Sequence, residues 1–211
     1  MKNKIIIILL IFYQILFFNK LFAKEIKFDA SDIEINEGGN LTIANNGIAK
    51  IEDDGIIVEG VKIKYFKDQS LIIVEQGKIS KIDLDLKIIS GTIEYNLKDA
   101  KINFKDKVNI DDKINNLVIY SDQIDYDVNN QKISGQDKTK IIDEFDNTYE
   151  VGEFEYSTKN RIIKLANTKV LDQNENIFDL EVAYLDLNKK EIVAKDIGLN
   201  FKISENSENE P

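Results

Sequence analysis

The sequence contains no histidine, no cysteine and no tryptophan, and its one proline is the last residue, Pro211. Without histidine or cysteine, the chain has no Ser-His-Asp or Cys-His nucleophile, no disulfide and no ordinary zinc site. Only carboxylates, lysines, tyrosines and hydroxyls remain for chemistry. Because proline is tolerated in loops but is missing before residue 211, the connections between elements are expected to be short.

The composition favours a single β-rich domain. The chain has 211 residues, of which 43% are apolar, so it can bury a core of ordinary size. It contains 36 isoleucines and only 8 alanines. Isoleucine is enriched in strands and alanine is depleted there, so the balance indicates strand rather than helix.

The first 23 residues have the layout of a secretory signal peptide. Residues 1–4 are basic, residues 5–18 are apolar apart from Gln14, and residues 19–23 turn polar and end on Ala23. The alternative is an uncleaved membrane anchor, but the apolar run is shorter than the roughly 20 residues of a spanning helix. The sequence therefore predicts an exported protein with a β domain over residues 24–203. An acidic tail, or the start of a further segment, follows at residues 204–211.

Export makes the chain more acidic. Of 28 basic and 38 acidic residues, three lysines and no acid lie in residues 1–23, so the net charge of −10 becomes −13 after their removal. An excess of negative charge is a poor match for nucleic acid and for anionic membrane surfaces. No nucleic-acid partner is predicted.

An internal repeat of about 30 residues organises the remaining chain. Tyr65, Tyr95, Tyr126 and Tyr156 each end an apolar–x–Tyr phrase, and a fifth copy has Leu185 in the tyrosine place. The intervals are 30, 31, 30 and 29 residues. An isoleucine follows seven residues after each of these positions, beyond a polar turn. Repetition at a fixed period of this size is typical of stacked supersecondary units.

Each copy of the repeat is predicted to form a β-hairpin. Apolar and polar residues alternate with a period of two, which places the apolar set on one face of a strand. Polar turns separate the strands, and second turns are expected at residues 75–77 and 105–107 of the copies. Strands of about 5–7 residues would then form a stack of twelve to sixteen strands. Such hairpins would form two facing sheets or a solenoid, with an apolar interior and a charged exterior.

The repeat resembles the OstA-like family of lipopolysaccharide-transport proteins. The family phrase resembles Ala-Asp-x-hydrophobic-x-Tyr, a charged turn, and a glycine-containing return strand. The most similar copy is residues 121–127 followed by 133–135, and residues 30–35 followed by 41–47 are also similar. The resemblance covers about residues 28–203. It implies an antiparallel β-jellyroll, an open twisted sheet pair with an apolar groove.

The resemblance also implies a function without catalysis or a cofactor. The groove would bind the acyl chains of lipopolysaccharide in the periplasm, in association with the outer membrane. The residues predicted to line it are Ile63, Tyr65, Ile72, Val74, Ile93, Tyr95, Ile102, Phe104, Ile124, Tyr126, Ile133, Phe154, Tyr156 and Ile163. Other lipopolysaccharide-transport proteins would pair with the terminal strands. The residues of these partner edges are Ile26, Phe28, Ile33, Ile35, Ile197, Leu199 and Phe201.

Several alternatives stay open at this point. Within the family, the chain fits a periplasmic bridge of LptA type and the N-terminal domain of a truncated LptD-type protein. Outside it, the same alternation fits an ordinary β core without a ligand, or an exported solenoid or adhesin. Acidic pairs such as Asp83 and Asp85 would suit a carboxylate enzyme, and Asp122, Asp125 and Asp127 are calcium-type ligands. With 38 acidic residues, such groups arise from composition alone.

Overall fold

The computed structural model describes residues 24–200, and this part of the chain is almost entirely β-strand. The predicted signal peptide at residues 1–23 and the predicted tail at residues 204–211 lie outside the described residues. Short 3₁₀ turns occur at Glu37–Gly39, Glu52–Asp54 and Ile82–Leu84. The strands are β1 (Ile26–Asn36), β2 (Leu41–Ile51), β3 (Ile56–Phe66), β4 (Leu71–Lys81), β5 (Leu86–Asn96), β6 (Lys101–Asp112), β7 (Leu117–Asp127), β8 (Lys132–Ile142), β9 (Thr148–Ser157), β10 (Ile162–Leu171), β11 (Ile177–Asp186) and β12 (Glu191–Asn200).

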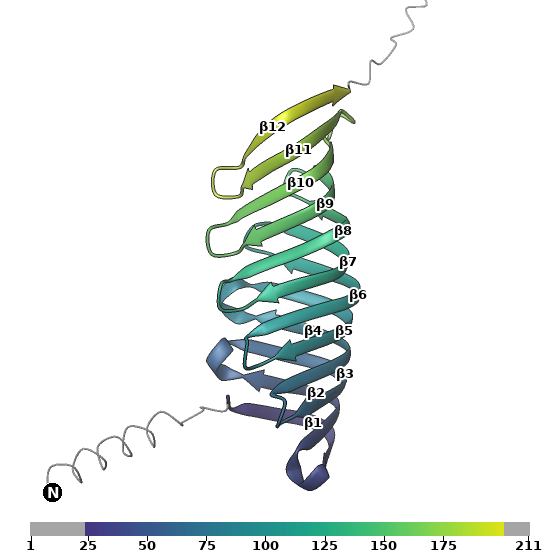
Figure 1. The fold of residues 1–211 in the computed structure, drawn as a ribbon, viewed down its shortest axis with the longest axis vertical. Coiled ribbons are helices and arrows are strands. Elements are labelled where there is room, and N and C mark those ends of the chain that lie inside the picture. Colours follow the sequence, from purple (N-terminus) through teal and green to yellow (C-terminus); the bar gives the residue numbers. More distant parts are fainter. Residues whose placement is uncertain (1–23, 201–211) are drawn as a thin grey trace, which may run out of the picture.

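The strands form one twelve-stranded sheet in which every strand pairs with its neighbours in the chain (Figure 1). All eleven pairings are antiparallel. Each repeat of about 30 residues supplies two successive strands, so the tyrosines of the repeat fall on β3, β5, β7 and β9. The predicted all-β, antiparallel jellyroll class built from hairpin repeats is confirmed.

The strands are 10 to 12 residues long, about twice the predicted length. The expected second turns at residues 75–77 and 105–107 are wrong, because these residues lie inside β4 and β6. In Figure 1 the strands in the middle of the stack curve over one side and return behind, so each strand contributes to two facing layers. The polar residues that suggested turns mark this bend.

We name the two halves of the folded sheet layer A and layer B. Layer A ends in the turns at residues 37–40, 67–70, 97–100, 128–131, 158–161 and 187–190. Layer B ends in the turns at residues 52–55, 82–85, 113–116, 143–147 and 172–176. The side of the molecule where the two sets of turns face each other is called the seam. It lies opposite the bend.

The local sequence explains why the strands bend. Strands β2, β4, β6, β10 and β12 carry a left-handed residue at the bend, including Asn46 (φ 46°) in β2 and Gln76 (φ 48°) in β4. Gly60 pairs with Gly77 across the bend. A Cβ atom on Gly77 would lie 2.7 Å from the carbonyl oxygen of Glu59, which only glycine avoids. Close backbone approach at small residues therefore lets the sheet fold on itself.

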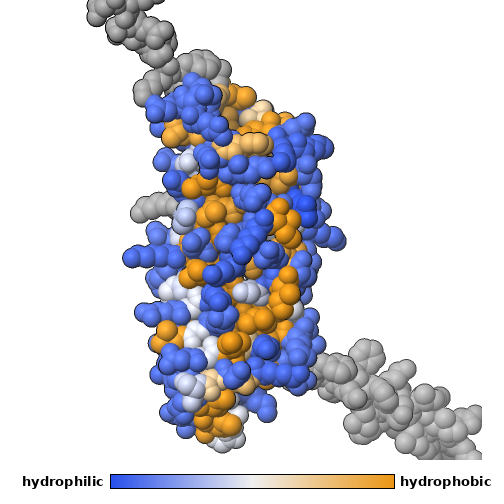
Figure 2. All heavy atoms as spheres, turned by 180° about the vertical axis from the view of Figure 1, so that it is seen from behind, coloured by the Kyte–Doolittle hydropathy of each residue, from blue (hydrophilic) through white to orange (hydrophobic). Residues whose placement is uncertain are grey.

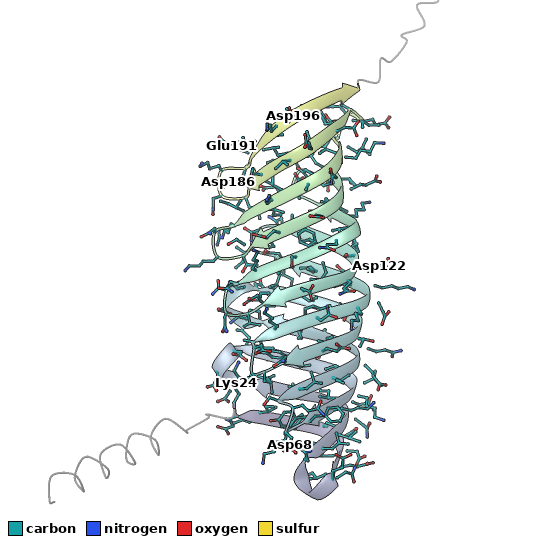
Figure 3. The ribbon with its side chains drawn as sticks, viewed as in Figure 1. Lys24, Asp68, Asp122, Asp186, Glu191 and Asp196 are labelled. Carbon is teal, nitrogen blue, oxygen red and sulfur yellow. The ribbon has the colours of Figure 1, made fainter. Side chains whose placement is uncertain are left out.

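The two layers enclose one continuous hydrophobic core that extends from β2 to β11. Apolar side chains alternate into this core, and charged side chains alternate outward. Figure 3 shows the charged side chains projecting from the ribbon, with Asp122 and Glu191 among the labelled ones; both are exposed. The charged exterior and apolar interior therefore match the expected alternation.

Candidate functional site

The interior between the layers is the candidate site. Thirteen of the fourteen residues predicted to line a groove are buried, and Tyr65 is partly buried against the same cluster. The four repeat tyrosines occupy equivalent positions on alternate strands, so their predicted common inward face is confirmed. All fourteen belong to layer A. Whether they contact lipid stays a prediction.

Layer B supplies the facing half of the interior, which the sequence analysis missed. The alternation of buried residues changes phase at the bend: in β3, Ile56 and Val58 are buried before it, and Ile63 is buried after it. An odd interval breaks a period-two pattern, so each strand looked like two. The buried layer B residues are Ala49, Ile51, Ile56, Val58, Ile79, Leu86, Ile88, Val108, Ile110, Leu117, Ile119, Ile141, Tyr149, Val151, Val170 and Leu180.

The interior is closed in this structure because the side chains of the two layers fill it. Tyr95, Phe104 and Tyr156 are among the largest side chains of the core, and each has an exposed fraction of 0%. Protein cores of this kind are packed without room for a guest molecule. An acyl chain could therefore occupy the interior only if the layers moved apart.

The bend closes one side of the interior with continuous backbone. Two buried hydroxyl groups there bond to nearby backbone: Ser90 Oγ donates to the carbonyl of Thr92 at 2.8 Å, and Ser121 Oγ donates to that of Gln123 at 3.1 Å. Every strand that bends joins the two layers covalently. The layers therefore cannot separate along this side while the strands persist.

The seam closes the opposite side with side chains. The Tyr95 hydroxyl, from the layer A end of β5, donates to the Asp54 carboxylate in a layer B turn. The Tyr156 hydroxyl donates in the same way to Asp112 at the layer B end of β6. Asn115 Nδ2 donates to the Tyr156 hydroxyl oxygen at 2.8 Å. We call each such tyrosine–aspartate contact a latch.

Burial dominates the ionisation of these tyrosines. It raises the pKa of the Tyr95 hydroxyl well above its ordinary value, and the hydrogen bond to Asp54 raises it further. Burial likewise raises the pKa of Tyr156, with the negative charge of Asp112 as the next cause. The tyrosines are therefore neutral donors at physiological pH, which is the form that a latch requires.

The seam differs at its C-terminal end, where Leu185 replaces the repeat tyrosine. There Lys190 Nζ lies 2.7 Å from a Glu144 carboxylate oxygen and 5.7 Å from the centre of the Phe145 ring. Asp143, in the same turn, accepts a 2.6 Å hydrogen bond from Tyr149 within its own hairpin. A charged contact thus replaces the latch where the repeat loses its tyrosine.

The first and last described strands are the edges of the sheet. β1 pairs with β2 on one side, and β12 pairs with β11 on one side. Ile33 and Ile35 on β1 have exposed fractions of 43% and 68%, and Ile197 on β12 has 54%. Ile26 and Phe28 are partly buried against the core. The side chain of Leu199 and the whole of Phe201 lie outside the described residues.

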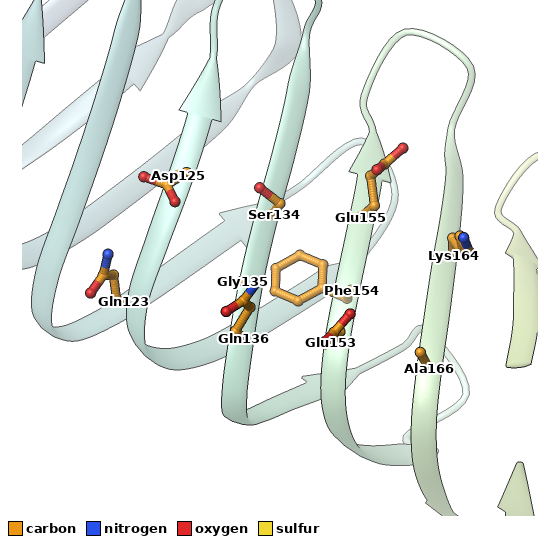
Figure 4. A pocket seen from close by; sticks show the side chains of 10 residues that line it. All are labelled: Gln123, Asp125, Ser134, Gly135, Gln136, Glu153, Phe154, Glu155, Lys164 and Ala166. Atoms are coloured by element: carbon orange, nitrogen blue, oxygen red, sulfur yellow. The ribbon is translucent and has the colours of Figure 1, made fainter. Parts of the chain in front are cut away.

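The outer surface carries a separate, polar depression of about 490 Å³ over β7 to β10. Figure 4 shows its side chains, which come from the strands where they run along layer A. Asp125, Glu155 and Lys164 are among them, and Gly135 leaves room for the Phe154 ring beside it. Figure 2 shows apolar patches scattered among hydrophilic residues on the rear face. The depression meets the core at Phe154, which lines it and belongs to the hydrophobic cluster.

Two further properties of residues 24–200 bear on the alternatives. No group of three or more acidic residues is placed to hold a metal ion in this part of the chain, and that includes Asp122, Asp125 and Asp127. Among the same residues, there is no helix with the length and apolar character needed to cross a membrane.

The described chain is thus an all-β protein whose single antiparallel sheet folds into two layers around a continuous apolar interior. No family model matches the chain, and no curated protein matches it. Among solved structures, it is similar to LptH of Pseudomonas aeruginosa, described as the LptA-homologous periplasmic component of the conserved lipopolysaccharide transport device. The alignment has 14% identity, covers 66% of this chain and 80% of LptH, and has a TM-score of 0.27. A TM-score this low assigns neither fold nor function, which rest on the strands, interior and edges described above.

Proposed function

We propose that this protein binds the acyl chains of lipopolysaccharide between its two layers and takes part in carrying it across the periplasm to the outer membrane. The observation that carries the proposal is the continuous apolar interior, which runs through nearly the whole stack of strands. Acyl chains need an unbroken apolar path, and a stacked repeat provides one at every level. The role calls for no cofactor and no catalytic residue.

The unequal sides of the interior support this function. The bend is fixed by backbone, whereas the seam is held by a few polar side chains, including Tyr95 with Asp54 and Tyr156 with Asp112. A lipid whose polar part stays in water needs an interior that opens along one side only. Parting at the seam would expose the predicted lipid-lining residues of layer A and the opposing residues of layer B together.

The edge strands support association with other transport proteins. β1 and β12 each present unpaired backbone groups, and such edges accept strands from partners. A free-standing LptA-like bridge would use both edges, while an LptD-like domain would receive its partner on β1. Pairing of this kind is head-to-tail and not two-fold. Strand addition on β1 is therefore proposed in both cases.

A second candidate is an exported structural β protein with no ligand. The full burial of core residues such as Ile63 and Ile72 favours it, because both are at 0% exposure. The two candidates differ in whether the layers ever part. An apolar dye that gains fluorescence with this protein, and is displaced by lipid, would favour lipid binding.

Photo-crosslinking tests lipid binding directly. A photoreactive amino acid is placed at interior positions Ile72 or Ile133, or at outward positions Glu94 or Lys164, and the cells are irradiated. Capture of lipopolysaccharide from the interior positions alone is the expected result. Equal capture from both sets of positions would contradict lipid binding in the interior. Circular dichroism of each variant verifies that the bulky residue leaves the sheet intact.

Strand addition on β1 is tested with proline. Ile35→Pro removes a backbone donor at an exposed edge position, and it is expected to weaken association with the neighbouring transport component while the monomer stays folded. Ile35→Thr keeps the donor and serves as the matched control. Chemical crosslinking measures the association. Unchanged crosslinking of the proline variant would count against β1 as the edge.

A further inference from the structure

Of the three fully buried repeat tyrosines, Tyr95 and Tyr156 form latches across the seam and Tyr126 does not. Tyr95 bonds Asp54, which lies 41 residues earlier, and Tyr156 bonds Asp112, which lies 44 residues earlier. Tyr126 occupies the equivalent place on β7, between these two. Its hydroxyl group is buried and has no hydrogen-bond partner among the described residues.

The sequence of the facing turn explains the missing latch. The 3₁₀ turn Glu52–Asp54 is followed by Gly55, and the equivalent turn Ile82–Leu84 is followed by Asp85. This alignment puts Leu84 in the place of the latch residue Asp54. The remaining carboxylate of that turn, Asp83, lies 2.7 Å from Lys81 Nζ, and its side chain is 57% exposed. The Tyr126 hydroxyl group therefore donates to no carboxylate of this turn, although the negative charge of Asp83 is close enough to raise its pKa, after the larger effect of burial.

Beside this position the seam is also hollow. A cavity of about 200 Å³ lies between the two sets of turns. Leu84 and Leu86 line it from layer B, and Tyr156 and Arg161 line it from layer A. Its lining mixes the apolar side chains of Leu84, Leu86 and Ile114 with polar and charged ones. Such a lining suits an amphiphile whose chain enters the protein while its polar part remains outside.

Opening the seam has different consequences at these three buried tyrosines. At Tyr95 and Tyr156, separation breaks a hydrogen bond to a carboxylate, which is stronger than a neutral one. At Tyr126, separation breaks no hydrogen bond, and it gives water access to a hydroxyl group that is buried without a partner. The seam is therefore weakest at Tyr126 and Leu84, in the middle of the stack.

We propose that an acyl chain of the lipid inserts sideways between the layers at Tyr126 and Leu84, with the latches on either side holding the seam together. This inference rests on the proposed function, since it assigns the place where the same interior takes up its ligand. The competing route is insertion through the ends of the stack, next to β1 or β12. The rate of uptake by that route would not depend on the residue at position 84.

Restoring the missing latch tests the proposal. Leu84→Asp gives Tyr126 a carboxylate acceptor, and Leu84→Met is the matched apolar control. The rate of uptake of lipid A with a fluorescent acyl chain is measured by stopped-flow mixing from detergent micelles. Leu84→Asp is expected to slow uptake by roughly tenfold, the effect of one hydrogen bond to a charged group. Leu84→Met is expected to leave the rate unchanged.

Two further variants separate the latch from simple damage. Leu84→Asp combined with Tyr126→Phe keeps the new carboxylate but removes its donor, so uptake is expected to recover. Asp54→Leu removes an existing latch and is expected to accelerate uptake. Because Asp54 also pairs with Lys24 Nζ at 2.7 Å, Lys24→Met is its control. Circular dichroism and the urea midpoint establish that each variant is folded.

The results distinguish failure of the insertion site from failure of the proposed function. A folded Leu84→Asp variant that takes up lipid at the wild-type rate would overturn sideways insertion and leave the proposed function standing. Slowed uptake that Tyr126→Phe fails to restore would also overturn it. A wild-type protein that takes up no lipid from micelles or vesicles contradicts the proposed function, and the insertion site falls with it.

Discussion

The bend and the seam are the two long sides of one interior, but backbone closes the first and side chains close the second. At the bend, the backbone itself crosses between the layers, and glycines such as Gly60 and Gly77 bring neighbouring strands together. At the seam, hydroxyl and carboxylate groups from turns about 40 residues apart close the gap. Opening at the bend would require strands to unfold, whereas the proposed opening at the seam would leave every strand paired.

This difference indicates where sequence changes act on stability and where they act on opening. Substitutions at the bend disturb backbone packing in both layers at once. Substitutions at the seam change a few polar contacts and leave the shared core and the backbone of the bend in place. Four measurements would test this difference between the bend and the seam.

Alkaline pH should weaken the seam most. Burial raises the pKa of Tyr95, Tyr126, Tyr149 and Tyr156 above the value of about 10 that they have when unfolded. Their stabilising contribution is complete below pH 10 and is lost as the pH rises toward the folded pKa values. The free energy of unfolding should then fall by about 1.4 kcal/mol per tyrosine per pH unit. Urea unfolding at pH 8, 10 and 11 measures it. A midpoint that stays constant to pH 11 would contradict the burial of these hydroxyl groups.

Loss of one latch should cost less. Tyr156→Phe removes the donor to the buried Asp112 carboxylate, and hydrogen bonds to charged groups contribute about 1.5–3 kcal/mol. The free energy of unfolding in urea is expected to fall by that amount. Tyr184→Phe, at a 46% exposed tyrosine on β11, is the control and should change it by less than about 0.5 kcal/mol. Equal effects of the two variants would refute the latch.

A methyl group at the bend should cost about 1–3 kcal/mol through overpacking. In Gly77→Ala, the new Cβ would lie 2.6 Å from Val74 Cγ1 and 2.7 Å from the backbone oxygen of Glu59. In the control Gly198→Ala, the nearest atom is Asp179 Cβ at 3.5 Å, an ordinary contact. Chemical denaturation compares the two variants. If both prove neutral, close packing at the bend is not what shapes the sheet.

Removal of the unpaired hydroxyl group should have the smallest effect. Tyr126→Phe takes away a buried polar atom without a partner, so the free energy of unfolding should stay constant or rise by up to about 1 kcal/mol. The contrast with Tyr156→Phe is the informative quantity, because the two residues share a place in the repeat. A destabilisation as large as that of Tyr156→Phe would show that Tyr126 has a partner after all.

The sequence predicted the fold class well because the repeat is visible in the spacing and alternation of its side chains. The interval of about 30 residues between Tyr65, Tyr95 and Tyr126 corresponds to two strands, and alternation identified the inward face of layer A. Layer B was missed for a physical reason. The chain turns through its bend without a loop, and the left-handed residues there, such as Asn46 and Gln76, resemble turn residues.

The seam was beyond reach of sequence reasoning for a different reason. Acidic residues are abundant, so nothing in the sequence distinguishes Asp54 and Asp112, which the tyrosines contact, from Asp53 or Asp111 beside them. The distinction arises only when the sheet folds over and brings turns about 40 residues apart together. One signal was available: the spacing from Asp54 to Tyr95 recurs approximately from Asp112 to Tyr156.

Because each strand pairs with its neighbours in the chain, the number of repeats determines the length of the interior. Adjacent strands lie roughly 4.8 Å apart, so each repeat of two strands lengthens the interior by about 10 Å. Twelve strands then form a stack roughly 50 Å long. Duplication or deletion of one whole repeat would change this length in a fixed step and preserve the register of every remaining latch. The distance that such a protein spans therefore follows from its number of repeats.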